Sequence, residues 1–125
     1  MSEIRATTIS DAAGTGPIDL HKQSAAKSWV NLNGEGTIAI RNSYGTSSIV
    51  DITVGTYAQN FSSAFDAGDN YASHSTADDE GWGNKTTIYY QTASQARMQV
   101  FQGSAATNSG VDTYRAIMTH HGDLA

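Results

Sequence analysis

The chain of 125 residues contains no cysteine, one proline and only three residues each of leucine, lysine and glutamate. Without cysteine, neither a disulfide nor a thiol-ligated metal site is available. Leucine, lysine and glutamate are strong helix formers, so their scarcity argues against long helices and against a heptad coiled coil. These absences leave a chain whose regular structure must come mainly from strands.

Two further classes of protein are excluded by charge and by the lack of long apolar runs. Twelve carboxylates outnumber seven lysine and arginine residues, so no basic stripe is present to neutralise phosphates, and we expect no nucleic-acid partner. No stretch approaches the ~18 consecutive apolar residues of a membrane span. The first ten residues also lack the basic and apolar regions of a signal peptide. We therefore expect no membrane insertion.

The composition favours strands but supplies few aliphatic core residues. Leucine, isoleucine, valine and phenylalanine total 20 of 125 residues, or 16 %, which is below the ~20 % at which an independent core becomes doubtful. Fourteen threonines, six tyrosines and two tryptophans nevertheless form a strand-forming composition. A chain that buries little apolar surface alone gains stability when identical chains cover its remaining faces. We therefore expect self-association.

From residue 24 onward the chain alternates between strand patterns and turn residues. The spacing predicts an all-β fold, an antiparallel β-sandwich or jelly roll of about eight strands. The first two strands flank Asn33-Gly34-Glu35-Gly36, whose residue types are those of a hairpin turn. We expect strands at residues 28–33, 37–44, 48–54, 57–62, 70–76, 85–92, 96–103 and 112–120.

Alternation within the early strands predicts which side chains enter the core. Ile38 and Ile40 share one face of their strand. Val50, Ile52 and Val54 share one face of the next strand, with Asp51 and Thr53 on the other. We expect both of these apolar faces to be buried.

The later strands carry large side chains on both faces. Met98 and Val100 lie opposite Phe101, and Ala116 and Met118 lie opposite Ile117. Two-sided strands of this kind are expected where one face meets the core and the other meets a second subunit or a ligand. The residues expected at an interface between subunits are Tyr89, Phe101 and Ile117.

An acidic run beside a tryptophan is the best recognition segment in the sequence. Asp78, Asp79 and Glu80 repel one another and therefore stay in water. Trp82, between two glycines, is either an exposed platform on which sugar rings stack or an anchor packed beneath a solvated loop. The first alternative predicts recognition of a glycan, and the second predicts an ordinary loop.

The other constellations give no catalytic centre. His120 and His121 point to opposite faces of one strand, so a metal site would need one histidine from each of several identical chains; the alternative is a surface or polar-core histidine. The sequence has no nucleophile elbow, phosphate-binding glycine loop or paired catalytic carboxylates. We therefore expect no enzyme activity and no cofactor.

Four segments resemble, in order, the short fibre-like virion proteins of tailed bacteriophages, especially those of marine and cyanobacterial hosts. They cover about half the chain and consist of packing and turn residues. The segments are Ser24–Arg41 (SAAKSWVNLNGEGTIAIR), Tyr44–Ile52 (YGTSSIVDI), Gly55–Phe65 (GTYAQNFSSAF) and Asp69–Ala72 (DNYA).

This resemblance implies a homotrimer in the virion, made in the host cytoplasm. Residues 1–23 would be an N-terminal arm that binds other virion proteins or wraps a neighbouring subunit, and residues 24–125 would be the sandwich domain. The implied task is display or attachment, with a host-surface glycan as a possible ligand. Two alternatives stay open: a capsid decoration or head-fibre protein without a receptor, and a free carbohydrate-binding module.

Overall fold

The computed structural model describes residues 25–79, 82–102 and 110–125, so the expected arm at residues 1–23 lies outside the described part. Every regular element in these ranges is a strand, and none is a helix that could cross a membrane. The strands are β1 (Ser28–Asn33), β2 (Ala39–Tyr44), β3 (Thr46–Thr53), β4 (Thr56–Phe61), β5 (Ala72–Asp79), β6 (Trp82–Gly83), β7 (Lys85–Gln91), β8 (Gln95–Phe101) and β9 (Arg115–His121).

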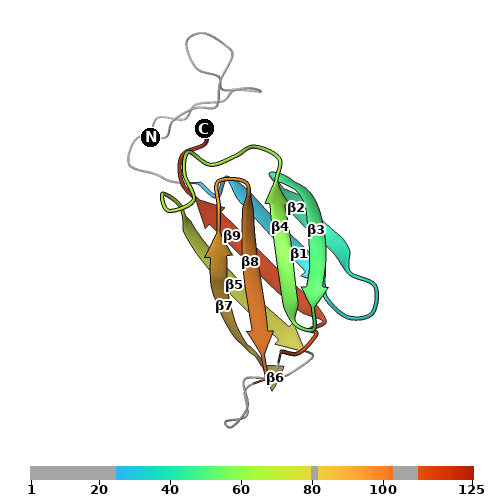
Figure 1. The fold of residues 1–125 in the computed structure, drawn as a ribbon. Coiled ribbons are helices and arrows are strands. Elements are labelled where there is room, and N and C mark those ends of the chain that lie inside the picture. Colours follow the sequence, from blue (N-terminus) through green and yellow to red (C-terminus); the bar gives the residue numbers. More distant parts are fainter. Residues whose placement is uncertain (1–24, 80–81, 103–109) are drawn as a thin grey trace, which may run out of the picture.

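The strands form two antiparallel sheets that pack face to face (Figure 1). Sheet A has the order β2-β1-β9-β5-β6, and sheet B has the order β3-β4-β8-β7. The all-β prediction is confirmed, and each of the eight expected strands corresponds to an observed one within a few residues. The two-residue β6 is a ninth strand that the sequence pattern does not predict.

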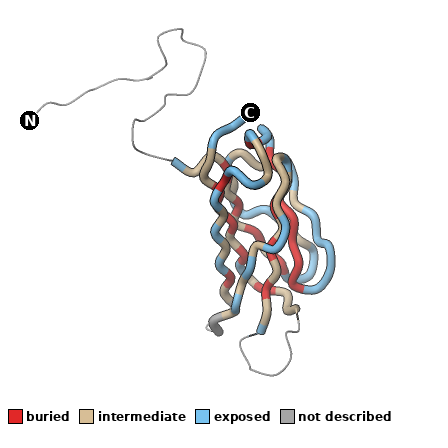
Figure 2. The backbone as a smooth tube through the Cα atoms, turned by 60° about the vertical axis from the view of Figure 1, so that its left-hand side comes forward, coloured by how far each residue is buried: buried red, intermediate tan, exposed pale blue. Residues whose placement is uncertain are grey.

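The core lies between the sheets, and both sheets contribute to it. Burial alternates along β1, β8 and β9, as expected for strands with one face on the core (Figure 2). The inward positions expected for Met98, Val100, Ala116 and Met118 are confirmed. Side chains with no exposed surface in this cluster are Val30, Leu32, Tyr57, Met98, Val100, Ala116 and Met118.

The core faces expected for the second and third strands are wrong. Ile40, Val50, Ile52 and Val54 are between 41 and 57 % exposed, and only Ile38 packs partly against the core. The reason is that β2 and β3 are edge strands, each with a neighbour on one side only. In β3, moreover, the half-buried Ile49 packs against the core, so alternation turns Val50 outward.

The β1–β2 hairpin has the turn that the sequence predicts, and this turn contacts sheet B. Gly36 adopts a φ of 63°, the left-handed region that favours glycine. Gly34 is buried, and its carbonyl oxygen accepts a hydrogen bond of 3.2 Å from the Tyr57 hydroxyl. The same hydroxyl accepts a bond from the Thr113 backbone N–H at 3.3 Å. Tyr57 therefore ties the hairpin to the segment before β9.

We expect Gly34→Ala to destabilise the protein more than Gly36→Ala. A methyl group at position 34 would collide with the Tyr57 hydroxyl, whereas one at position 36 meets open space. The first change should lower the free energy of unfolding by about 3 kcal/mol through overpacking and disturbed hydrogen bonds. The second should cost about 1 kcal/mol for a left-handed alanine. Urea unfolding measures both, and equal losses would contradict this role for Tyr57.

Candidate functional site

A chain of hydrogen-bonded side chains crosses the outer face of sheet B, and we call Ser48, Asn60, Gln95 and Arg97 the polar ladder. Asn60 Nδ2 donates to Ser48 Oγ at 2.8 Å, and Gln95 Nε2 donates to Asn60 Oδ1 at 2.7 Å. Arg97 Nε donates to Gln95 Oε1 at 2.6 Å. The Arg97 guanidinium then lies 4.4 Å from the centre of the Tyr90 ring. The connected groups thus span all four strands.

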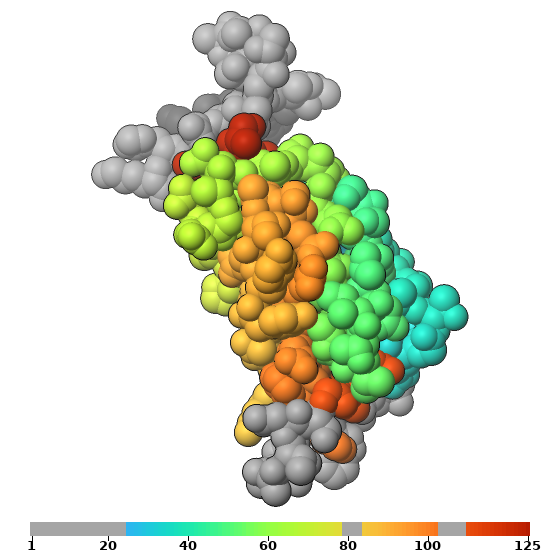
Figure 3. Space-filling view, viewed as in Figure 1, coloured from blue at the N-terminus to red at the C-terminus, as the bar shows by residue number. Residues whose placement is uncertain are grey.

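The register of sheet B places these groups on one face. Val50, Ala58, Arg97 and Tyr90 form a single row across β3, β4, β8 and β7. Figure 3 shows this outer face, where the atoms of β7 and β8 (orange) lie beside those of β3 and β4 (green). Because Met98 and Val100 point into the core, Arg97 must point outward.

A β-bulge in β7 brings Tyr90 into that row. Ile88 pairs with Met98 and Tyr90 pairs with Arg97, so Tyr89 is an extra residue on its strand. Ile88 packs partly against the core. In a regular strand Tyr90 would then also point inward, and the bulge instead leaves Tyr89 and Tyr90 48 and 42 % exposed.

The two tyrosines line an open cleft of about 330 Å³ between β7 and the loop that follows β4. We call it the tyrosine cleft; its lining residues are Gly68, Asp69, Tyr71, Ile88, Tyr89, Tyr90 and Gln91. The Tyr71 hydroxyl donates to the Thr92 carbonyl oxygen at 2.9 Å, and Gln91 Nε2 donates to the Tyr71 carbonyl oxygen at 3.3 Å. These bonds hold the loop beside the strand.

The cleft and the ladder combine two kinds of contact. Exposed tyrosine rings stack on flat apolar surfaces, including the apolar faces of sugar rings. Amide, carboxylate and guanidinium groups form hydrogen bonds with hydroxyl groups and anions. Because the ladder groups bond to one another, their orientations are fixed before any ligand arrives. The arrangement is suited to binding a polar ligand with ring faces.

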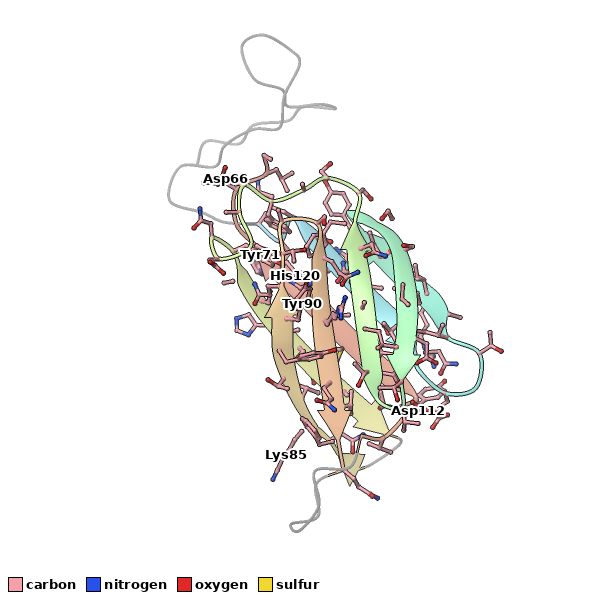
Figure 4. The ribbon with its side chains drawn as sticks, in the orientation of Figure 1. Asp66, Tyr71, Lys85, Tyr90, Asp112 and His120 are labelled. Carbon is pink, nitrogen blue, oxygen red and sulfur yellow. The ribbon has the colours of Figure 1, made fainter. Side chains whose placement is uncertain are left out.

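His120 lies in the core beside this site and makes hydrogen bonds with both ring nitrogens (Figure 4). Gln59 Nε2 donates to Ser28 and Thr46, so Gln59 Oε1 accepts from His120 Nε2 at 3.0 Å. His120 Nδ1 therefore accepts from the Ser73 hydroxyl at 2.7 Å. Burial, and to a lesser degree neighbouring His121, lowers the pKa of His120 to about 4.

An aromatic cluster packs around His120 and connects it to the cleft. The Phe61 and Tyr71 rings lie 5.0 and 5.7 Å from the imidazole, both edge to face. Phe65 stacks on Tyr71 at 4.1 Å. Tyr71 is thus both a wall of the tyrosine cleft and a neighbour of His120.

The two histidines considered as metal ligands have different environments. Both nitrogens of His120 are used within the core, and His121 is half-buried on the other face of β9. Within the described ranges, no three histidine, aspartate or glutamate residues gather as a metal ion would require. The Ser73–His120 contact has the geometry of a nucleophile and base, but His120 is fully buried.

The segment expected as a displayed acidic loop is partly a hairpin. Asp78 and Asp79 end β5, and Trp82 begins β6 and pairs with Asp79. Asp78 lies 3.4 Å from Arg115 in an ion pair whose side chains are about half exposed. Glu80 lies outside the described residues. Strand pairing therefore continues into residues that the charge pattern assigns to a loop.

The three residues expected at a subunit interface do not come together in one chain. Tyr89 lines the tyrosine cleft. Phe101 is half-buried at the end of β8, opposite Lys85. Ile117 lies on the outer face of sheet A, in a small cavity of about 110 Å³ beside Asp78 and Arg115. Phe101 and Ile117 thus belong to opposite outer faces of the sandwich.

The polar ladder and Tyr90 are the functional candidates that sequence reasoning missed. The sequence assigns Tyr90 to the same face as Ile88, because the bulge at Tyr89 leaves no signal in the alternation. Gln95 and Arg97 stand two residues apart and share a face, but their contact with Asn60 depends on the β4–β8 register. No family model, curated protein or solved structure matches the chain.

The buried histidine makes stability depend on pH. Unfolded histidine has a pKa near 6.5, whereas folded His120 has one of about 4. Between these values the unfolded chain binds more protons, so stability falls as the pH is lowered from 6.5 to 4, by about 3 kcal/mol. Urea unfolding at a series of pH values measures this slope.

The matched variants for this measurement are His120→Gln and His74→Gln. His120→Gln should be less stable at neutral pH but should lose most of the slope between pH 6.5 and 4. His74 is exposed on β5, so His74→Gln should keep the wild-type slope. A slope that persists unchanged in His120→Gln would show that other groups cause it.

Proposed function

We propose that this protein is a structural protein of a tailed-phage virion, a homotrimeric fibre or spike that attaches the particle to a glycan of the host surface. The observation that carries the attachment role is the tyrosine cleft with the polar ladder beside it. The resemblance of Ser24–Arg41 and the later segments to phage fibre proteins supplies the virion setting. The role is binding, without catalysis.

The position of the chain ends is compatible with this role. The start of β1 and the C-terminus lie at the same end of the sandwich, where Ser28 pairs with His120 near the end of β9 (Figure 1). An arm of residues 1–23 that binds other virion proteins would therefore leave at that end. The part of the outer face of sheet B formed by β7 and β8, which runs along the length of the domain, would stay accessible (Figure 3).

Exposed apolar side chains supply contacts for a trimer. A three-fold interface joins two different patches of each chain, so the two patches need not be adjacent. One patch is the edge formed by β2 and β3, where Ile40, Val50 and Ile52 are exposed. The second is the outer face of sheet A around Ile117. Neither of these two interface patches includes Tyr89, so its ring would stay accessible to a ligand in the tyrosine cleft.

A free carbohydrate-binding module is the second candidate function. It is favoured by the fact that one chain forms a closed core and a complete cleft without a neighbour. Such a module would be monomeric and would bind a glycan without any virion. A head-fibre or decoration protein would instead bind purified capsids and no glycan.

We expect Tyr89→Ala to weaken glycan binding about tenfold through loss of ring stacking. Affinity gel electrophoresis against a panel of soluble plant, algal and bacterial polysaccharides identifies a binder and measures the change. Thr37→Ala, an exposed change in the β1–β2 hairpin of sheet A, is the control and should bind like the wild type. Binding that survives in Tyr89→Ala would remove the cleft from the site.

We expect the wild type to have three times the mass of the 13.2 kDa chain in light scattering at micromolar concentration. Val50→Asp places a charge in the proposed interface and should give folded monomer. Ser62→Asp, an exposed change in the loop after β4, should remain trimeric. A monomeric wild type would overturn the trimer and favour the free module.

A further inference from the structure

Charge is distributed unevenly over this acidic protein. The chain carries a net charge of −5, yet the strands of sheet B place two cations, Lys85 and Arg97, on their outer face. The only carboxylate in these strands, Asp51, pairs with the inward-pointing Tyr57 and acts on its hydroxyl, so it belongs to the inner side. On sheet A, by contrast, Asp78 neutralises Arg115. The outer face of sheet B is therefore cationic.

Arg97 is held in one orientation by two contacts. Its Nε atom donates to Gln95 Oε1 at 2.6 Å, and Gln95 is held in turn by Asn60. Its guanidinium plane lies over Tyr90. Among the described residues, neither of its Nη atoms has an acceptor. A fixed guanidinium with two such donors matches the paired oxygens of a carboxylate, sulfate or phosphate.

The residues of the tyrosine cleft determine how a bound sugar ring would be oriented relative to Arg97. Tyr90 contacts the guanidinium and also lines the tyrosine cleft, so an anion bound to Arg97 would lie next to a ring held in the cleft. Asp69 is the one carboxylate among the lining residues. It accepts hydrogen bonds from hydroxyl groups and repels an anion, which favours a ring with its acid group toward Arg97.

We infer that the ligand is an acidic glycan, whose anionic group binds Arg97 while its ring stacks in the tyrosine cleft. This inference rests on the proposed function and names the substrate class of that site. Lys85 lies opposite Phe101, four residues beyond Arg97 along β8, which is about 13 Å away. It supplies a second cation for a further acidic unit, so a polymer should bind more tightly than a single sugar.

The test compares polymers that differ only in charge. Polygalacturonate carries a carboxylate on every sugar, and its methyl ester has the same backbone without the charge. Chondroitin sulfate and its desulfated form separate a sulfate from a carboxylate. The full chain should bind the more acidic member of at least one pair ten times more tightly at low salt, and this preference should shrink in 200 mM salt.

Three variants assign the preference to Arg97. Arg97→Gln should lose the preference for the more acidic polymer while still binding the neutral polymer weakly. Arg97→Lys should keep only part of this preference, because a single ammonium charge replaces the paired N–H donors of the guanidinium. Lys27→Gln, which removes a cation that lies outside sheet B, should behave like the wild type. Circular dichroism checks that each variant is folded.

The outcomes separate the inference from the proposed function. Equal or tighter binding of the less charged member in both pairs overturns the acidic ligand and leaves glycan binding intact. A charge preference that survives in Arg97→Gln overturns the role of Arg97. Failure to bind any polymer, charged or neutral, at millimolar sugar concentration overturns both proposals.

Discussion

The register of β8 between β4 and β7 is the constraint on which the rest of the molecule depends. Its inward residues, Met98 and Val100, have no exposed surface and meet side chains of sheet A in the core. The same register turns Gln95 and Arg97 outward, next to Asn60 and Tyr90. One strand therefore fixes both the hydrophobic interior and the polar surface, and a slip by one residue would exchange them.

Most of the strand pattern could be predicted from sequence because turn residues and alternation are local signals. The Asn33–Gly36 turn and the inward Met118 follow from such signals. Val50 and Ile52 could not be placed, because whether an apolar face is covered depends on which strand lies at the edge of a sheet. The low count of leucine, isoleucine, valine and phenylalanine also does not show how the core is filled, because Tyr57, Met98 and Met118 occupy much of it.

The candidate site was harder to predict than the fold, because its contacts join residues far apart in the sequence. Gln95 and Asn60 are 35 residues apart, and His120 and Gln59 are 61 apart. Tyr89 was predicted to lie at a trimer interface because of its place on a two-sided strand, whereas in the structure it is a bulge residue that lines a cleft. The acidic run, by contrast, predicted a recognition role for Asp78, which forms an ion pair with Arg115 on sheet A.

The bulge at Tyr89 also affects how this surface can change during evolution. Because Tyr89 is the surplus residue, its removal would leave Ile88 opposite Met98 and Tyr90 opposite Arg97. Gain or loss of a single codon at this position would therefore alter the shape of the cleft, while the register of β7 with β8 and the residues facing the core stay unchanged. Under the proposed attachment role, a phage lineage that must follow a changing host could alter this surface through such small insertions, without first redesigning the fold.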